Sequence, residues 1–151
     1  MNKKVRNATP TKVAGIQFKS MLEARVYKAL KAEGINPQYE KHTYTLSAKV
    51  TATVPFFNRT KQKGFHRIKG PVLSITYTPD FTFTLNGIFV IMEVKGKEND
   101  VYPIKRNLFR KYLETVKTKE KYPLMFFEIH SKTEALEAIK IVKSQNKDEL
   151  S

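Results

Sequence analysis

Asp80, Glu93 and Lys95 flank one predicted β-hairpin, and side chains of these types at this spacing could act together on a phosphate. Two apolar segments, 81–85 and 88–92, are joined by Asn-Gly, the preferred pair for a two-residue type I′ turn. In that register Asp80 falls opposite Glu93, with Cβ atoms about 4.5–5.5 Å apart on one face. Lys95 lies two residues beyond Glu93, so strand alternation places it on the same face.

The facing carboxylates of Asp80 and Glu93 repel each other unless a cation lies between them or one is protonated. Ligation by carboxylate oxygens alone suits Mg²⁺ or Mn²⁺ rather than zinc. Such an ion could orient a water and stabilise charge that develops on a phosphate. The alternative is an ordinary cross-strand cluster in which Asp80 and Glu93 share the Lys95 ammonium. The spacing leaves both readings open, and a β-bulge would shift every pairing by one residue.

The chain as a whole is strongly basic and contains no cysteine. Its 151 residues carry 28 Lys plus Arg against 14 Asp plus Glu, a formal charge of +14. A polyanion usually compensates repulsion on that scale, so we expect DNA or RNA as a partner, with a merely basic protein as the alternative. The lack of cysteine excludes a disulfide scaffold, a Cys-ligated metal and thiol catalysis. No apolar stretch approaches the roughly 20 residues of a membrane span, and no signal peptide is visible, so a cytoplasmic location without membrane contact is expected.

Basic residues gather in three segments of the sequence. Residues 1–17 are predicted to form a flexible or exchanged basic arm. Residues 56–71 are predicted to form a long loop that either contacts nucleic acid or is simply solvated. Lys105 and Arg106 begin the helix that follows Lys95, where they could contact a phosphate or lie on a solvated face. The loop residues expected to bind DNA are Arg59, Lys61, Lys63 and Arg67.

Aromatic and histidine residues do not define a site by themselves. Phe56, Phe57 and Phe65 lie among the basic residues and could stack on exposed bases, but the sequence selects none of them because such aromatics often belong to a core. The three histidines are scattered without metal-ligand spacing. Glu128 and His130 alternate on one predicted strand and are interpreted as edge polarity.

Hydrophobic periodicity predicts the order helix, antiparallel strands, helix, strand, helix. This order indicates an α/β fold in which helices flank a mixed central β-sheet. We expect a single domain over 18–145 and a frayed tail at 146–151. The predicted elements are a helix from Ser20 to Gly34, an extended region at 38–55, a strand at 72–78, the hairpin, a helix at 103–117 that buries Ile104, Leu108, Tyr112 and Val116, a strand at 124–129, and a helix opened by the capping box Ser131 and Glu134.

The same residues carry a family resemblance. Pro79-Asp80 followed by Glu93-Val94-Lys95 matches the PD-(D/E)XK nuclease motif. The wider run from Tyr77 to Gly96, with its Asn-Gly hairpin, resembles the phage endonuclease I type of Holliday-junction resolvase, as does the upstream Phe-Lys-Ser-Met-Leu-Glu at 18–23. The resemblance covers roughly residues 16–97, and residues 46–75 look like an insertion relative to the family.

The resemblance implies a restriction-endonuclease-like core, a homodimer with exchanged segments, and Mg²⁺-dependent cleavage of branched DNA. By position, Asp80 and Glu93 are then metal ligands, Lys95 is the catalytic lysine, and Glu23 is a helix carboxylate that completes a second metal position. Glu23 also lies three residues after Ser20, where a capping-box role would explain it equally simply. The rival functions are a PD-(D/E)XK nuclease of restriction or transposase type acting on linear duplex, and a basic module that binds nucleic acid without cleaving it.

Overall fold

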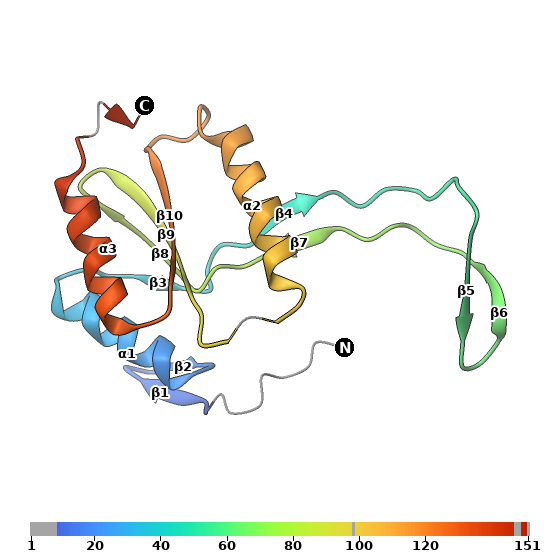
Figure 1. Ribbon diagram of the computed structural model, residues 1–151, viewed down its shortest axis with the longest axis horizontal. Helices are drawn as coiled ribbons and strands as arrows, with labels where there is room; N and C mark the ends of the chain where they lie inside the picture. The colour runs from blue at the N-terminus through green and yellow to red at the C-terminus, as the bar shows by residue number, and fades with distance from the viewer. Residues whose placement is uncertain (1–8, 98, 147–148, 151) are drawn as a thin grey trace. The chain divides into compact units, whose positions relative to one another are not determined.

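The computed structural model describes residues 9–97, 99–146 and 149–150, which form two compact units. Unit 1 comprises residues up to Thr43 and from Thr78 onward, and unit 2 comprises Tyr44–Tyr77. The elements of unit 1 are β1 (Thr11–Val13), β2 (Ile16–Phe18), α1 (Met21–Ala32), β3 (Gln38–Tyr39), β8 (Phe81–Leu85), β9 (Ile88–Val94), α2 (Tyr102–Val116), β10 (Leu124–Ile129) and α3 (Lys132–Ser144) (Figure 1). Those of unit 2 are β4 (Tyr44–Ser47), β5 (Phe56–Thr60), β6 (Gly64–Ile68) and β7 (Ile75–Tyr77).

A four-stranded mixed sheet is the centre of unit 1. Its strand order is β10-β9-β8-β3, with β9 parallel to β10 and antiparallel to β8. The predicted α/β class and mixed sheet are therefore confirmed. Among the described residues, no helix is both long and apolar enough to span a membrane.

The β8–β9 hairpin has the register that its turn predicts. Phe81 pairs with Met92 and Leu85 with Ile88, without a bulge. Asn86 and Gly87 have φ values of 52° and 67°, the left-handed conformation that a type I′ turn requires at both central residues. Asp80, one residue before Phe81, therefore lies across from Glu93, one residue after Met92.

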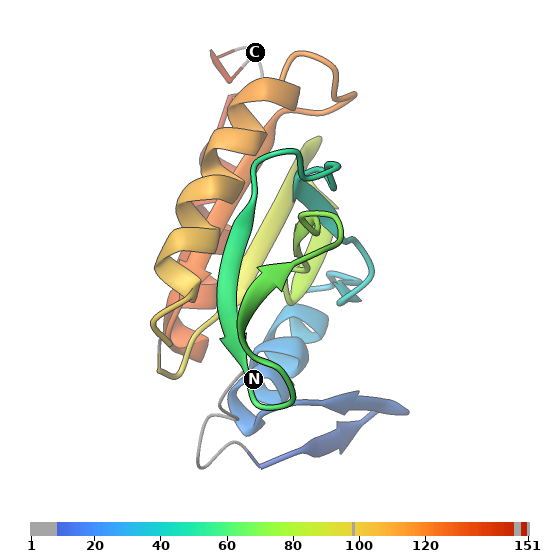
Figure 2. The same ribbon diagram turned by 90° about the vertical axis from the view of Figure 1, so that its right-hand side faces the viewer.

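Strand alternation divides the side chains of the sheet between two helical layers. Phe81, Phe83, Val90 and Met92 join the apolar cluster formed with α1 and α3, which pack against each other. On the opposite face, Phe109 of α2 packs edge-on against Phe126 of β10. Figure 2 shows α2 running along the sheet in a layer of its own. Asp80, Glu93, Lys95 and Glu128 have the strand positions of the α2 face.

The helix boundaries agree with their capping signals. The Oγ atoms of Ser20 and Ser131 each accept the backbone N–H three residues on, at 3.1 Å, and so begin α1 and α3. Gly34, with φ of +76°, follows the end of α1, as a C′ glycine does. The predicted buried stripe of α2 is wrong in part, because Ile104 is 62% exposed while Tyr102 and Phe109 are the buried residues. The buried face at the start of α2 therefore includes Tyr102 and not Ile104.

The predicted arm at 1–17 contains a β-hairpin. Residues 1–8 lie outside the described residues, and β1 pairs with β2 through Thr11, Val13, Ile16 and Phe18. Val13 and Ile16 pack on the core, so this hairpin is fixed by burial. In the predicted tail, 147, 148 and 151 also lie outside the described residues, and the Glu149 N–H donates to the Asn146 carbonyl.

The predicted loop at 56–71 is also an antiparallel hairpin, within unit 2. β5 pairs with β6 over five residue pairs, from Phe56 with Ile68 to Thr60 with Gly64. β4 and β7 pair further along the same two chain segments, with a bridge between Val50 and Val72. Backbone hydrogen bonds between the paired strands therefore hold a segment that the sequence pattern predicts to be a loop.

Candidate metal-dependent active site

Asp80 and Glu93 form a buried carboxylate pair on the α2 face of the sheet. Their relative exposures are 8% and 4%, and acids are rarely buried to this extent unless they are paired with cations. Asp80 Oδ2 accepts the Val94 N–H at 2.8 Å, so the backbone of β9 holds this carboxylate in place. The pair is positioned by the regular hairpin that lies directly after Pro79.

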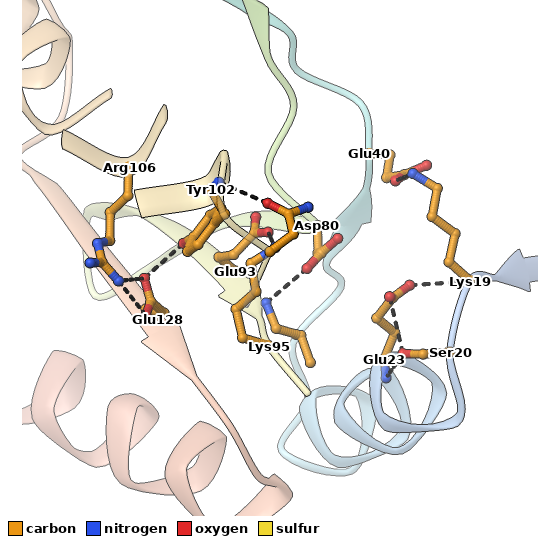
Figure 3. A network of polar contacts seen from close by, with 12 residues as sticks. Lys19, Ser20, Glu23, Glu40, Asp80, Glu93, Lys95, Tyr102, Arg106 and Glu128 are labelled. Carbon is orange, nitrogen blue, oxygen red and sulfur yellow. Dashed lines mark hydrogen bonds and ion pairs between the residues drawn. The ribbon is translucent and has the colours of Figure 1, made fainter. Parts of the chain in front are cut away.

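Lys95 supplies positive charge beside this pair. Its Nζ lies 2.6 Å from Glu93 Oε1 and 3.9 Å from the centre of the Tyr102 ring. The ring face attracts the ammonium and covers it, so the lysine is positioned from both sides. Figure 3 shows this lysine with the surrounding polar side chains.

Burial raises the pKa of Asp80 well above its usual range, and the negative charges of Glu93 and Glu23 raise it further. The Val94 hydrogen bond and the Lys95 charge act in the opposite direction but do not offset the desolvation. With both carboxylates ionised, the site would hold more negative charge than Lys95 neutralises. A bound divalent cation would relieve this repulsion, and so would protonation of Asp80.

Glu23 lies at the first turn of α1, buried at 7% exposure. Its Oε1 accepts the Ser20 Oγ–H at 3.0 Å, and its Oε2 accepts the Tyr39 hydroxyl at 2.6 Å and the Lys19 N–H at 3.1 Å. The contacts with Ser20 and Lys19 are those of a capping residue, the alternative that the sequence left open for Glu23, whereas the Tyr39 contact ties the carboxylate to β3. The same contacts fix its carboxylate within electrostatic range of Asp80.

A second polar group, which the sequence did not indicate, adjoins the site. Glu128 pairs in register with Glu93 across β9 and β10. It accepts the Tyr102 hydroxyl at 2.7 Å and Arg106 Nη1 at 3.0 Å (Figure 3). The strand pattern predicts edge polarity for Glu128, and the structure adds that Glu128 holds the tyrosine whose ring lies against Lys95.

The remaining predicted DNA-binding residues are distributed over both units. Arg106 is engaged with Glu128, whereas Lys105, the residue before it in α2, is half-buried. In unit 2, Arg59 and Arg67 lie on the β5–β6 hairpin, and Lys61 and Lys63 lie in its turn; all four are exposed. The structure thus gathers Asp80, Glu93 and Lys95 in one place and groups four of the predicted DNA contacts in another.

The carboxylate oxygens of Asp80 and Glu93 are the type of donor that Mg²⁺ prefers. Proteins usually hold Mg²⁺ through one or two carboxylates, with water and substrate phosphate completing the shell, so Asp80 and Glu93 fit. In the part of the chain that the structure describes, no group of three or more His, Asp or Glu side chains is arranged to hold a metal by itself. Thr82 Oγ1, on the same face two residues after Asp80, is buried without a hydrogen-bond partner among the described residues. A polar atom of this kind is typical of a site that takes water or a ligand.

The fold and this site define an α/β protein with a buried pair of carboxylates beside a lysine. Comparison with known families shows that the chain belongs to the family described as "Protein of unknown function (DUF1064)", which matches residues 3–124. The match includes α1, the β8–β9 hairpin, α2 and all of unit 2. No curated protein and no solved structure matches the chain significantly.

Proposed function

We propose that this protein is a metal-dependent endodeoxyribonuclease with a PD-(D/E)XK core, which hydrolyses phosphodiester bonds in branched DNA. One observation carries the proposal. Asp80 and Glu93 are buried side by side with Lys95 next to them, and the pKa of Asp80 is raised because burial and the neighbouring acids outweigh the charge of Lys95. Buried acids without enough compensating charge lower the stability of the folded protein. Carboxylates with pKa values perturbed in this way cluster at catalytic centres.

Asp80 and Glu93 would hold Mg²⁺, or Mn²⁺ in its place, and Glu23 would contribute to a second position. A bound ion supplies Lewis acidity, lowers the pKa of water and offsets phosphate charge. The hydrogen bonds from Ser20 and Tyr39 would keep the Glu23 carboxylate in a fixed orientation in this role.

The chain's own residues have distinct tasks in hydrolysis, in which water adds to phosphorus and one P–O ester bond breaks. The Val94 N–H fixes the orientation of the Asp80 carboxylate. Lys95 orients the attacking water or neutralises charge on the phosphate oxygens, and the Tyr102 ring keeps its ammonium at the site. Glu128 in turn holds Tyr102 in position through the tyrosine hydroxyl.

The net charge of +14 supports a polyanionic substrate. Lys105 and Arg106 on α2 would contact phosphates near the site, although Arg106 must first share or leave Glu128. The resemblance to phage resolvases favours a homodimer on four-way junctions, acting in the cytoplasm of the host cell if a phage encodes the protein. A linear-duplex nuclease of restriction or transposase type has the same active-site chemistry and differs only in substrate.

The test is cleavage of a synthetic four-way junction beside a linear duplex of the same sequence, with Mg²⁺ and with chelator. We expect Mg²⁺-dependent cleavage, faster on the junction. Asp80→Asn should reduce cleavage by about 10²- to 10³-fold or more, because a metal contributes several kcal/mol to the transition state. Junction binding should persist in this variant.

The matched control is Glu137→Gln, which removes an exposed carboxylate from α3 and should leave cleavage unchanged. Undiminished cleavage by Asp80→Asn would defeat the assignment of the site. No product from any DNA with Mg²⁺ or Mn²⁺ would favour the rival function, a binding module without catalysis. Faster cleavage of the linear duplex would favour the restriction or transposase type.

A further inference from the structure

One face of the β5–β6 hairpin presents aromatic and arginine side chains in alternation. The register pairs Phe57 with Arg67 and Arg59 with Phe65. Since directly paired residues share a face, all four side chains lie on the same side of the ribbon. We call these four residues the aromatic–arginine face.

The two phenylalanines of this face are open to solvent. Phe57 is 52% exposed and Phe65 is 69% exposed, and both arginines are exposed as well. The rings stack on each other across the strands, with centroids 6.1 Å apart and planes 28° from parallel. This arrangement leaves flat apolar surface in water, which is unfavourable at about 25 cal/mol for each Å² unless a partner covers it.

The charge of the surrounding segment indicates what kind of partner covers it. Unit 2 contains six Lys and Arg residues and no Asp or Glu, although the whole chain has 14 acids. A protein partner with charges of both signs would not require a surface that carries only cations. The phosphate backbone of a nucleic acid complements such a surface. Arginine beside an aromatic platform is the combination that binds single strands, because phosphates pair with the cations while bases stack on the rings.

We propose that the aromatic–arginine face binds unpaired bases of DNA. The bases stack on Phe57 and Phe65, while Arg59 and Arg67 contact the flanking phosphates. A paired duplex presents base edges in its grooves rather than base faces, so this surface discriminates in favour of strands opened at a branch point. The inference rests on the proposed function in taking DNA as the partner, but it requires no cleavage.

The hairpin provides a matched control on its other face. Phe56 is next to Phe57 in sequence and is similarly exposed, at 59%. It pairs with Ile68 and therefore points to the opposite side of the ribbon, away from both arginines. Binding that depends on the aromatic–arginine face must distinguish Phe57 from Phe56, whereas attraction by net charge alone cannot.

The absence of tryptophan from the chain makes the test direct. Phe57→Trp and Phe56→Trp each introduce the protein's single indole, on opposite faces of the hairpin. Each full-length variant is titrated, in chelator so that no DNA is cut, with a 20-nucleotide oligo(dT), the matching duplex and oligo(U). We expect oligo(dT) to quench the indole of Phe57→Trp strongly, the indole of Phe56→Trp little, and the duplex to quench both weakly.

Affinity measurements by fluorescence anisotropy complete the test. Phe57→Ala and Phe65→Ala should each weaken oligo(dT) binding by about 5- to 100-fold, the usual effect of losing one stacked base, and Phe56→Ala should not weaken it. Circular dichroism checks that each variant is folded, and Phe57→Tyr, which keeps the ring, should restore binding if the alanine variant is not folded.

Several results would overturn the proposal. Equal quenching in the two tryptophan variants would show that charge alone binds DNA at this hairpin. Tighter binding of oligo(U) than of oligo(dT) would make RNA the partner, and a change in oligomeric state caused by Phe57→Ala would make it a second copy of the chain. Because these assays contain chelator, their failure leaves the cleavage result of Asp80→Asn unaffected, and the converse also holds.

Discussion

The two units of this protein differ in the sign and the burial of their charged residues. Unit 1 contains every acidic residue of the chain and buries three of them, Glu23, Asp80 and Glu93. Glu93 and Glu23 are both close enough to Asp80 to raise its pKa. Unit 2 contains no acid, buries little, and exposes cations beside aromatic rings. Both arrangements are unfavourable for an isolated protein, the first through desolvated like charges and the second through exposed apolar surface.

On our two proposals, a different partner relieves each arrangement. A compact divalent cation suits the buried carboxylates, because it must enter a confined space and neutralise charge there. A polyanion with flat bases suits the hairpin, because it must cover an open surface that carries several cations. On the proposed function and the further inference, DNA supplies phosphates for the metal site and unpaired bases for the hairpin.

Removing four of the six cations of unit 2 should give the largest change in DNA affinity. A variant with Arg59, Lys61, Lys63 and Arg67 all replaced by Gln should bind single-stranded DNA at least about 10-fold more weakly at low salt. The slope of log affinity against log salt should fall by about 0.9 for each phosphate that the variant no longer neutralises on duplex DNA, or about 0.7 on single strands. Anisotropy titrations at salt concentrations from about 50 to 200 mM measure both quantities, because affinity that depends on phosphates changes steeply over this range.

The control for that variant replaces four exposed cations on the helices of unit 1, Arg25, Lys28, Lys132 and Lys140, by Gln. It has the same net charge, so an attraction that depends on net charge alone would be weakened equally in both variants. Equal decreases in affinity would mean that the two units do not differ in how they bind DNA.

The two helix caps of unit 1 should give a smaller and more selective effect. Ser20→Ala and Ser131→Ala remove the same cap hydrogen bond, and each should cost about 1 kcal/mol of unfolding free energy. Ser20→Ala also removes the hydrogen bond to Glu23 Oε1. It should therefore reduce the cleavage rate by a factor of about 2 to 10, which corresponds to the net free energy of one hydrogen bond. Urea unfolding and junction cleavage, measured on both variants, separate the two effects. If both variants cleave equally well, Glu23 acts only as a cap.

Most of unit 1 could be predicted from local sequence signals. The Asn-Gly pair defined the β8–β9 register, and Ser20 and Ser131 defined helix starts, because turns and caps depend on a few neighbouring residues. The β5–β6 hairpin could not be predicted in this way. Charged residues occupy both of its strands, and its register follows from backbone pairing rather than from one buried face.

The candidate site was predictable as far as the hairpin extends. Asp80, Glu93 and Lys95 follow from register alone, but the contributions of Tyr102 and Glu128 depend on how α2 and β10 pack against β9. Those interactions depend on tertiary packing between separate elements, and no local pattern specifies them. The same limit applies to Tyr39, which holds Glu23 from the edge strand β3.

Thermal unfolding with and without Mg²⁺ is the sharpest test of whether the buried pair of Asp80 and Glu93 takes a divalent cation. Because the pKa of Asp80 is raised in the folded state, its ionisation disfavours folding, so stability falls as pH rises from the usual aspartate pKa through the raised value. At pH 7 in chelator, Asp80→Asn should therefore melt higher than the wild type, by about 2–4 °C for each kcal/mol relieved.

Millimolar Mg²⁺ or Mn²⁺ should raise the melting temperature of the wild type and of Glu137→Gln, but not that of Asp80→Asn. The difference in melting temperature between Asp80→Asn and the wild type at pH 7 should therefore narrow or reverse. Equal responses to the ion in the wild type and Asp80→Asn, together with a lower melting temperature for Asp80→Asn in chelator, would contradict the account.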